Sequence, residues 1–361
     1  MKRQKIQDYT KSNRDTKINR MFNIFNEKAT DANLRKFAKQ LMDLSDQIGF
    51  KVSSRGWCYQ LETARVINKD QFNRVEEVIN KCRKKGILPI DFVAEEEGRQ
   101  FSGVEEENSK TPLQFLKSYI ESPLYCHRWY TPDWWDGEEY YIQMLVEKID
   151  LKTLFSPVCE KYHIPIATSK GWSSMLQRAI YANRFKEAED KGLKCVLLYC
   201  GDHDPDGLRI SEFMRSNLDD IKDITWENGN IGYDPTDLII QRFGLDAGFI
   251  RKHNLTWIDN LITGSGKDLA SPSHKNFKLP YVQAYLKKFG EKKCEANAIV
   301  PMPEEARNLV EEAIVDFVGN KAIERFNQKM WEVEKEMDRV RIKTGLKKTI
   351  DKAIKLIDNE E

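Results

Sequence analysis

Residues 195–207 read CVLLYCGDHDPDG and decide the fold of this chain. Positions 195–200 form a short apolar run, which predicts a buried strand, and a helical pattern begins at Leu208. In an open α/β sheet, ligands bind outside the carboxyl ends of the strands. Asp202 and Asp204 directly follow such an end. Two carboxylates spaced in this way can share one hard cation, so the turn predicts a Mg²⁺ site, with Mn²⁺ as the alternative ion, and metal-assisted chemistry on phosphates.

A third acid, Glu147, closes another strand-like run at residues 140–148. Between the two runs the pattern predicts a helix, a short strand and a second helix, over 151–162, 164–168 and 173–190. This alternation predicts an α/β fold with a mainly parallel sheet flanked by helices. The carboxylates of Glu147, Asp202 and Asp204 are then expected to hold one metal at one sheet edge. The alternative is that Asp202 and Asp206 only cap the following helix.

The composition indicates how many domains the chain can form and where its charge is concentrated. The 361 residues are 40% hydrophobic and 32% charged, with a formal net charge of +1, so the chain is long enough for two domains with their own cores. Both ends are basic: residues 1–40 carry eleven Lys and Arg against four Asp and Glu, and residues 339–355 carry seven against one. Such segments suit a phosphate backbone, although a solvated charged face explains either one equally well.

The cysteines and the apolar runs indicate the cellular compartment in which the protein functions. The seven cysteines, an odd number, include no Cys-x-x-Cys pair, and the five histidines are scattered. This pattern predicts reduced thiols in a cytoplasmic setting, and neither a disulfide framework nor a zinc site. No apolar run approaches the roughly 20 residues that span a membrane. The basic, polar start also differs from a secretory signal.

The N-terminal region predicts a DNA-binding module that follows a basic arm at residues 1–30. Apolar spacing and capping residues predict three helices, over 31–48, from Ser53 or Ser54 to 67, and from 72 to a stop at Gly86. An extended segment at 87–94 follows. This is the outline of a winged-helix domain, here 31–105, which would place one helix in the DNA major groove. The third helix is basic, as phosphate contact requires, through Arg74, Lys81, Arg83, Lys84 and Lys85.

Three further parts are predicted after this module. They are a linker, the α/β domain and a charged C-terminal helix, at 106–137, 138–320 and 321–361. Large aromatics in the linker either pack the domains together or offer stacking faces to bases, and packing is the commoner role; they are Trp129, Tyr130, Trp134 and Trp135. Additional helices are expected over the sheet within 234–261 and 281–318.

Arg55 and Tyr59 lie one helical turn apart in the second predicted helix. The strand ending in Glu147, the alternation and the Asp-x-Asp turn resemble the Toprim domain of topoisomerases, primases and some nucleases. A winged-helix domain with an arginine four residues before a tyrosine, followed by a Toprim domain, resembles the A subunit of topoisomerase VI and the related meiotic double-strand-break proteins. The chain is most similar to free-standing relatives of that subunit from phages, plasmids and integrated elements, over roughly residues 34–318.

Several segments carry this closer resemblance, and their shared order makes it specific. In chain order they are Arg83–Pro89, Glu97-Gly98-Arg99, Val146-Glu147-Lys148, Gly171-Trp172-Ser173-Ser174, Gly201–Gly207, Tyr285 with Phe289-Gly290, and Cys294–Ala298. Two positions depart from the pattern. Cys58 stands where the relatives usually have a first tyrosine, which leaves Tyr59 alone as nucleophile. Asn297 stands where they often have aspartate, which weakens any late acidic ligand.

The resemblance implies an enzyme like the A subunit of a type IIB topoisomerase, which cleaves double-stranded DNA by metal-dependent transesterification. Tyr59 would form a 5′-phosphotyrosyl link, Arg55 would stabilise phosphate or phenolate, and Glu147, Asp202 and Asp204 would hold Mg²⁺. A tyrosine hydroxyl has a pKa of about 10, so it needs a cation nearby to attack phosphorus. The resemblance also implies a homodimer in which the tyrosine of one protomer meets the metal of the other. The ATPase partner would be a separate subunit, because this chain does not contain it.

Two other functions stay open. In the first, Tyr59 is structural and the acids run Toprim-type, metal-dependent hydrolysis of DNA. In the second, the chain is a non-catalytic DNA-binding subunit with a vestigial site. A covalent protein–DNA adduct would separate transesterification from both. Free cut ends without an adduct would indicate the nuclease, and binding without cutting would indicate the subunit.

Overall fold

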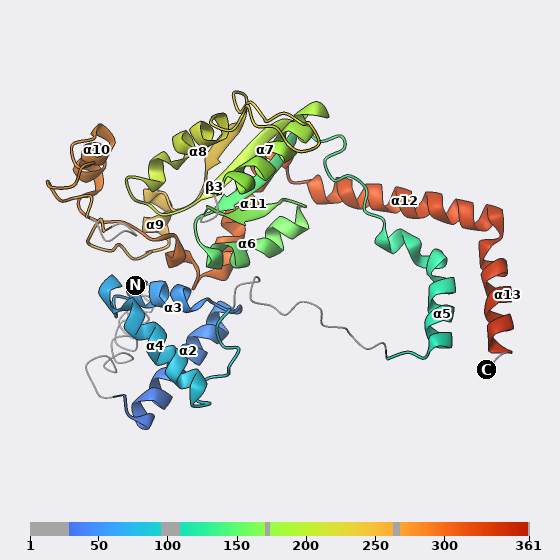
Figure 1. The fold of residues 1–361 in the computed structure, drawn as a ribbon, viewed down its shortest axis with the longest axis horizontal. Coiled ribbons are helices and arrows are strands. Elements are labelled where there is room, and N and C mark those ends of the chain that lie inside the picture. The colour runs from blue at the N-terminus through green and yellow to red at the C-terminus, as the bar shows by residue number, and fades with distance from the viewer. Residues whose placement is uncertain (1–28, 95–108, 170–173, 263–267, 360–361) are drawn as a thin grey trace, which may run out of the picture. The chain divides into compact units, whose positions relative to one another are not determined.

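The chain forms two compact units, each assembled from two separate stretches of sequence. The computed structural model describes residues 29–94, 109–169, 174–262 and 268–359 (Figure 1). The first unit joins Met1–Glu95 to Tyr140–Asp316, and the second joins Glu96–Glu139 to Phe317–Glu361. Nearly all of the predicted basic arm (residues 1–28) and two of the family-like segments, Glu97–Arg99 and Gly171–Ser173, lie outside the described residues.

A four-stranded parallel sheet is the centre of the first unit. In chain order the strands are β1 Tyr140–Val146, β2 Ile166–Thr168, β3 Lys194–Cys200 and β4 Ile239–Arg242. Their spatial order is β2-β1-β3-β4, and every neighbouring pair is parallel. The inner strands β1 and β3 are buried along nearly their whole length, as their continuous apolar runs predict for a sheet covered on both faces. The predicted α/β class with a parallel sheet is confirmed.

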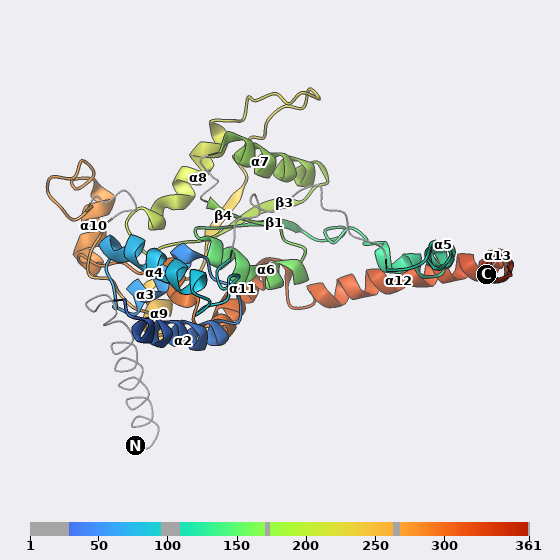
Figure 2. The ribbon, with the colours of Figure 1, turned by 60° about the horizontal axis from the view of Figure 1, so that its bottom comes forward.

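Helices cover both faces of this sheet. Figure 2 shows α7 and α8 on one face and α6 and α11 on the other. The helices of this part are α6 Ile149–Lys161, α7 Met175–Asp190, α8 Ile210–Asp219, α9 Ala247–Lys252, α10 Pro280–Phe289 and α11 Pro303–Val318. The helix predicted within 234–261 is present as α9, but the segment also contains β4, a fourth strand that the sequence pattern did not predict. A strand of four residues, of which only two are apolar, is too short for periodicity to separate strand from helix.

Three helices near the N-terminus complete the first unit. They are α2 Asp31–Ile48, α3 Ser54–Thr63 and α4 Phe72–Lys84, with a 3₁₀ turn, η2 Lys69–Gln71, before α4. The hydroxyls of Thr30 and Ser53 cap α2 and α3 by accepting backbone N–H bonds. The segment 87–94, predicted to be extended, folds mainly as turns, and only Ala94 pairs with Ser53. The rest of the predicted wing, residues 95–105, lies outside the described residues.

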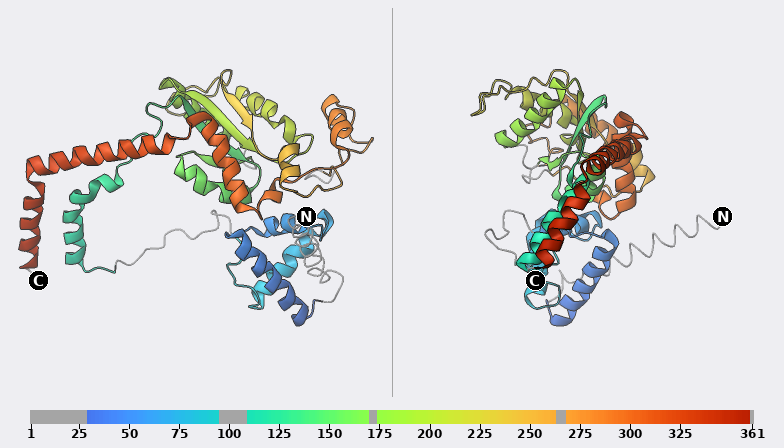
Figure 3. Two further views of the ribbon diagram at one scale, coloured as in Figure 1. Left: turned by 180° about the vertical axis from the view of Figure 1, so that it is seen from behind. Right: turned by 90° about the vertical axis from the view of Figure 1, so that its right-hand side faces the viewer.

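In its described parts, residues 109–139 and 317–359, the second unit contains four helical segments. They are α5 Pro112–Glu121, the 3₁₀ segment η4 Ser122–Trp129, α12 Ala322–Thr344 and α13 Leu346–Asp358. The predicted linker at 106–137 therefore includes helix. The charged tail is two helices, because Gly345 adopts φ +63° and ends α12; Figure 3 shows the bend there. Trp134 is buried against Phe326 with ring centroids 4.8 Å apart, so its role is packing within this unit.

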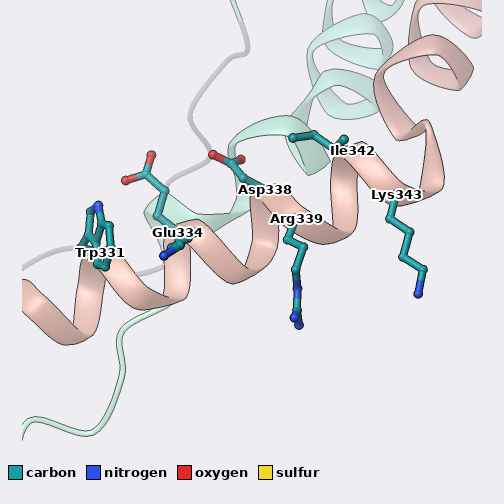
Figure 4. A pocket seen from close by; sticks show the side chains of 7 residues that line it. Trp331, Glu334, Asp338, Arg339, Ile342 and Lys343 are labelled. Carbon is teal, nitrogen blue, oxygen red and sulfur yellow. The ribbon is translucent and has the colours of Figure 1, made fainter.

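One face of α12 forms the shallow hollow of Figure 4. Its volume is about 620 Å³, and Trp331, Ile342 and alternating acidic and basic residues line it. The seven cysteines of the chain are all free thiols, six of them buried. Within the described residues, no helix combines the length and the apolar character that crossing a bilayer demands.

Candidate active site

The register of the sheet brings the predicted acids together. Val146 at the end of β1 pairs with Cys200 at the end of β3, so the residues that follow these strands are neighbours. The backbone N–H of Asp202 donates to Glu147 Oε2 at 2.7 Å. The N–H of Gly207 donates to Asp204 Oδ1 at 2.6 Å, which closes the acidic turn. A Cβ on Gly207 would lie 2.3 Å from the Asp202 carbonyl oxygen, so this tight turn requires glycine.

Asp202 and Asp206 do not act as caps of the following helix. Asp202 Oδ1 accepts the backbone N–H of Ala296 at 2.6 Å. Asp206 accepts the hydroxyl of Tyr281 at 2.8 Å, and its side chain makes no capping bond to the 3₁₀ turn Gly207–Arg209. The acids therefore face other parts of the first unit, and the capping alternative fails.

Lys148 lies between three carboxylates. Its Nζ is 2.8 Å from Glu147 Oε1, 3.0 Å from Asp202 Oδ2 and 3.5 Å from Glu295 Oε2. The side chain of Lys148 is only 18% exposed, so these charges interact in a medium that screens them less than water does. Lys148 belongs to the Val-Glu-Lys segment, of which the sequence predicts only Glu147 as a site residue.

Glu295 is a site residue that the sequence reasoning missed. His203 and Cys294 pair as an antiparallel bridge, which places the segment after Cys294 beside the acidic turn. Glu295 is almost fully buried and also binds Lys69 at 3.0 Å and Lys293 at 2.8 Å. Its place in the Cys294–Ala298 segment, one of those that carry the resemblance, is the signal in the sequence that points to it.

Asn297, the position that departs from the family-like pattern, points elsewhere. Its Nδ2 donates to Asp150 Oδ2 at 3.2 Å, and its carbonyl accepts from Gln60 Nε2 at 3.0 Å. Asp150 Oδ1 in turn accepts the backbone N–H of Ser53 at 3.3 Å. These buried bonds tie α3 to the strand-and-helix part of the first unit, so the role of Asn297 is structural.

Eight charged side chains form one buried group, which we call the carboxylate cluster. Its acids are Glu62, Glu147, Asp202, Asp204 and Glu295, and its bases are Lys69, Lys148 and Lys293. With every member ionised, five carboxylates and three ammonium groups leave two negative charges in excess. The group is therefore short of positive charge.

The pKa values of the acids reflect this shortage. Burial, reinforced by Glu295, raises the pKa of Asp202 well above its usual range. Burial also raises the pKa of Asp204 to about 6 and that of Glu62 to about 7. Burial acts in the same direction on Glu147 and Glu295, but the neighbouring lysines outweigh it and hold both pKa values below their usual range. Three of the five acids thus have a pKa above the usual range of a carboxyl group.

Tyr59 lies beside the carboxylate cluster. Its ring is partly buried on α3, meets Phe72 edge-on at 5.3 Å and has the Lys148 Nζ 5.3 Å from its centroid. Burial raises the pKa of the Tyr59 hydroxyl, while Lys148 and Arg55 act to lower it. The structure thus brings the predicted nucleophile and the predicted metal ligands into one site.

Arg55 also contacts Phe72. Its guanidinium is 4.7 Å from the centre of that ring and pairs with Glu76 at 3.3 Å. Arg55 is exposed, so a phosphate could reach it, but no bond joins it directly to Tyr59 among the described contacts. Of the two residues predicted to be catalytic, Tyr59 is in the site and Arg55 is at its edge.

The donor set suits a hard divalent cation in its chemistry. All donors near the acidic turn are carboxylate oxygens, the ligands that Mg²⁺ and Mn²⁺ prefer, and two positive charges would balance the carboxylate cluster. No three Asp, Glu, His or Cys side chains in the described ranges are already spaced as a ligand set. Glu147, Asp202 and Asp204 are the residues that would hold the ion.

His203 stands between the two aspartates but takes no part in the cluster. Its ring is buried among Trp257, Tyr285 and Phe289, with centroids 4.8–5.8 Å away. Burial lowers the pKa of this imidazole to about 4, so the ring is neutral near pH 7. Its function is to anchor the acidic turn in the core.

The basic residues of α4 are partly engaged within the chain. Arg74 pairs with Glu77, Lys85 contacts Asp31, and Arg83 donates to the carbonyl of Ile90. Lys81 and Lys84 are exposed on the same helix. These two are the best placed of the five to meet a phosphate backbone.

Comparison with known proteins adds no relative. No family model, curated protein or solved structure matches the chain.

Proposed function

We propose that this chain is a DNA-cleaving enzyme that works by tyrosine transesterification, like the A subunit of topoisomerase VI. The observation that carries the proposal is the position of Tyr59, whose ring centroid lies 5.3 Å from Lys148 Nζ, the ammonium that also contacts the carboxylates of Glu147, Asp202 and Glu295. A structural tyrosine needs no such neighbours, whereas a nucleophile that attacks a phosphodiester needs cationic groups around the reacting oxygens.

The proposed step exchanges one ester for another. Tyr59 Oη forms a bond to phosphorus while the bond from phosphorus to the 3′ oxygen breaks. The phenol gives up its proton and the 3′ oxygen gains one, so the products are a 5′-phosphotyrosyl end and a free 3′-hydroxyl. Because burial raises the pKa of Tyr59, the phenolate depends on the Lys148 ammonium for stabilisation.

The other parts of the proposal follow the resemblance. Glu147, Asp202 and Asp204 would hold Mg²⁺ or Mn²⁺, which when bound supplies positive charge to phosphate oxygens. The helices α2–α4 would act as a winged-helix domain on double-stranded DNA, with Lys81 and Lys84 on the backbone. The second unit holds no residue of the carboxylate cluster. A homodimer and a separate ATPase subunit complete the proposal.

Replacing Tyr59 tests the proposal directly. Tyr59→Phe keeps the ring between Phe72 and Lys148 and removes only the hydroxyl. We expect the variant to bind DNA and to lose covalent attachment completely. The measurement is incubation with supercoiled plasmid and Mg²⁺ or Mn²⁺, stopped with detergent and analysed with and without protease, so that protein-linked ends are distinguished from free ends.

Tyr233→Phe is the matched control. Tyr233 is buried and donates to Glu189 at 2.7 Å, so this variant also loses one hydroxyl and about 1 kcal/mol of stability. It should still form the adduct. An adduct formed by Tyr59→Phe, or cutting by the wild type without any adduct, would reject Tyr59 as the nucleophile.

A metal-dependent nuclease is the second candidate function. It is favoured by Asp204, whose pKa of about 6 lies in the range of a general base that activates water. The same plasmid assay separates the two functions. Free ends that persist in Tyr59→Phe and disappear in Asp204→Ala would support hydrolysis.

A further inference from the structure

Lys148 occupies the space between the very carboxylates that would hold the metal. Its ammonium is 2.8 Å from Glu147 and 3.0 Å from Asp202, and it contacts the one Glu147 oxygen that the Asp202 N–H does not take. Asp202 uses its other oxygen to accept from Ala296. The two oxygens that face Lys148 are thus those left over by the backbone bonds.

Two cations cannot share these oxygens at low cost. Charges of the same sign a few ångströms apart repel strongly where water is scarce, and the Lys148 side chain is only 18% exposed. A divalent ion that binds Glu147 and Asp202 through these oxygens would therefore displace the ammonium group. Glu295 Oε2, at 3.5 Å, and the face of the Tyr59 ring, at 5.3 Å from Nζ, are the nearest partners left for it.

We propose that Lys148 is an internal counter-ion that competes with the divalent metal for Glu147 and Asp202, and that metal binding shifts its ammonium toward Glu295 and Tyr59. Lys148 is then a positioning residue, which links occupancy of the metal site to the cationic surroundings of the phenol. The proposal rests on the metal site of the proposed function and extends it, because it assigns a residue of the chain to the metal-binding oxygens of Glu147 and Asp202 when no metal is bound.

Mn²⁺ binding to the full-length protein, without DNA, tests the competition. The free Mn²⁺ signal in electron paramagnetic resonance reports the dissociation constant directly. Lys148→Met keeps the length of the side chain and removes its charge, and we expect it to bind Mn²⁺ at least about tenfold more tightly than the wild type. Lys148→Arg keeps the charge and should stay within about twofold of the wild type on the same argument.

Lys69→Met is the matched control. It removes one positive charge from the same carboxylate cluster, but Lys69 contacts Glu295 and not Glu147 or Asp202. Its effect on Mn²⁺ affinity should be clearly smaller than that of Lys148→Met. Equal effects of the two variants would mean that only net charge matters, and the competition would be rejected.

Two further results of the Mn²⁺ measurement would also contradict the competition. Unchanged or weaker Mn²⁺ binding by Lys148→Met, or no binding by any form, would overturn the inference. If circular dichroism shows that Lys148→Met does not fold, Lys148→Gln takes its place in the same assay. The adduct assay for Tyr59 needs no Lys148 variant, so failure of this inference and failure of the proposed function are seen separately.

Discussion

Glu62 should make the stability of the protein depend on pH near neutrality. It is 5% exposed, and burial raises the pKa of its carboxyl from about 4.5 to about 7. A raised folded-state pKa stabilises the fold fully below about pH 4.5, and this stabilisation is lost as the pH rises through about 7. Glu62→Gln stays neutral, so above pH 7 it should be more stable than the wild type by roughly 2–3 kcal/mol.

Urea unfolding at pH 4.5 and pH 8 measures this difference. The gain should be present at pH 8 and nearly absent at pH 4.5. Glu77→Gln, on the exposed side of α4, is the control and should show no such pH-dependent gain. A Glu62→Gln variant that is less stable than the wild type at pH 8 would mean that the charged carboxylate is a net stabilising partner of Lys69 and Lys293.

At the scale of single residues, the sequence predicted the acidic residues of the site better than the residues that contact them. Glu147, Asp202, Asp204 and Tyr59 are recognisable because each follows a strand end or sits in a motif. Glu295 reaches them only through the bridge between His203 and Cys294, and its bond to Lys69 joins residues 226 positions apart. No local pattern encodes such a pairing, because it depends on how distant segments pack.

At the scale of elements, α3 is held against α6 by a contact that tolerates no extra atom. A Cβ on Gly56 would lie 2.2 Å from Asp150 Oδ2 and 2.6 Å from Val52 Cγ1. Alanine is intrinsically a better helix former than glycine by about 1 kcal/mol. We nevertheless expect Gly56→Ala to destabilise the protein by roughly 1–3 kcal/mol, because overpacking dominates in a buried contact.

Thermal unfolding followed by circular dichroism measures the effect of Gly56→Ala. Ser54→Ala, in the same turn of α3, is the control and should change stability much less. The double variant Gly56→Ala with Asp150→Ala should lose less stability than the sum of the two single variants, since the nearest atom, Asp150 Oδ2, is then gone. A stabilised Gly56→Ala would show that α3 can move away from α6 without cost.

The sequence predicted the helices and strands whose apolar patterns are long, and it failed for the segments whose patterns are short. The apolar runs of β1 and β3 and the helical spacing of α2, α4 and α7 are long enough to identify each element. The four residues of β4 and the turns at 87–94 are not, because neighbouring strands and backbone bonds decide such short stretches. The division of the C-terminal tail depends on a single residue, Gly345.

At the scale of the whole molecule, the position of Tyr59 bears on how a dimer would cut DNA. The resemblance implies that the tyrosine of one protomer serves the metal of the other, but here the ring lies beside Lys148 of its own chain. We therefore expect each protomer to carry a complete site. A mixture of Tyr59→Phe and Asp202→Ala protomers should then form no covalent adduct.

The mixing experiment uses two differently tagged forms, purified together and assayed on plasmid DNA. A wild-type protomer mixed with Tyr59→Phe is the control and should retain cleavage of one strand. Recovery of the adduct in the Tyr59→Phe and Asp202→Ala mixture would show that one protomer completes the site of the other. A measured mass of a monomer, with and without DNA, would exclude sharing in any form.

Because the second unit is built from two separate stretches of sequence, the ribosome makes its helices at different times. Lys117 on α5 pairs with Asp358 on α13 at 2.8 Å, and the two residues are separated by the whole of the sheet in the sequence. At 5–20 residues per second, a ribosome needs roughly 10–50 s between them. During synthesis α5 therefore lacks its partner α13 for this time, while the sheet of the first unit can already form. The bonds between α5 and α13 therefore form only after the strands of the sheet have been made, so folding of the second unit depends on the pace of translation.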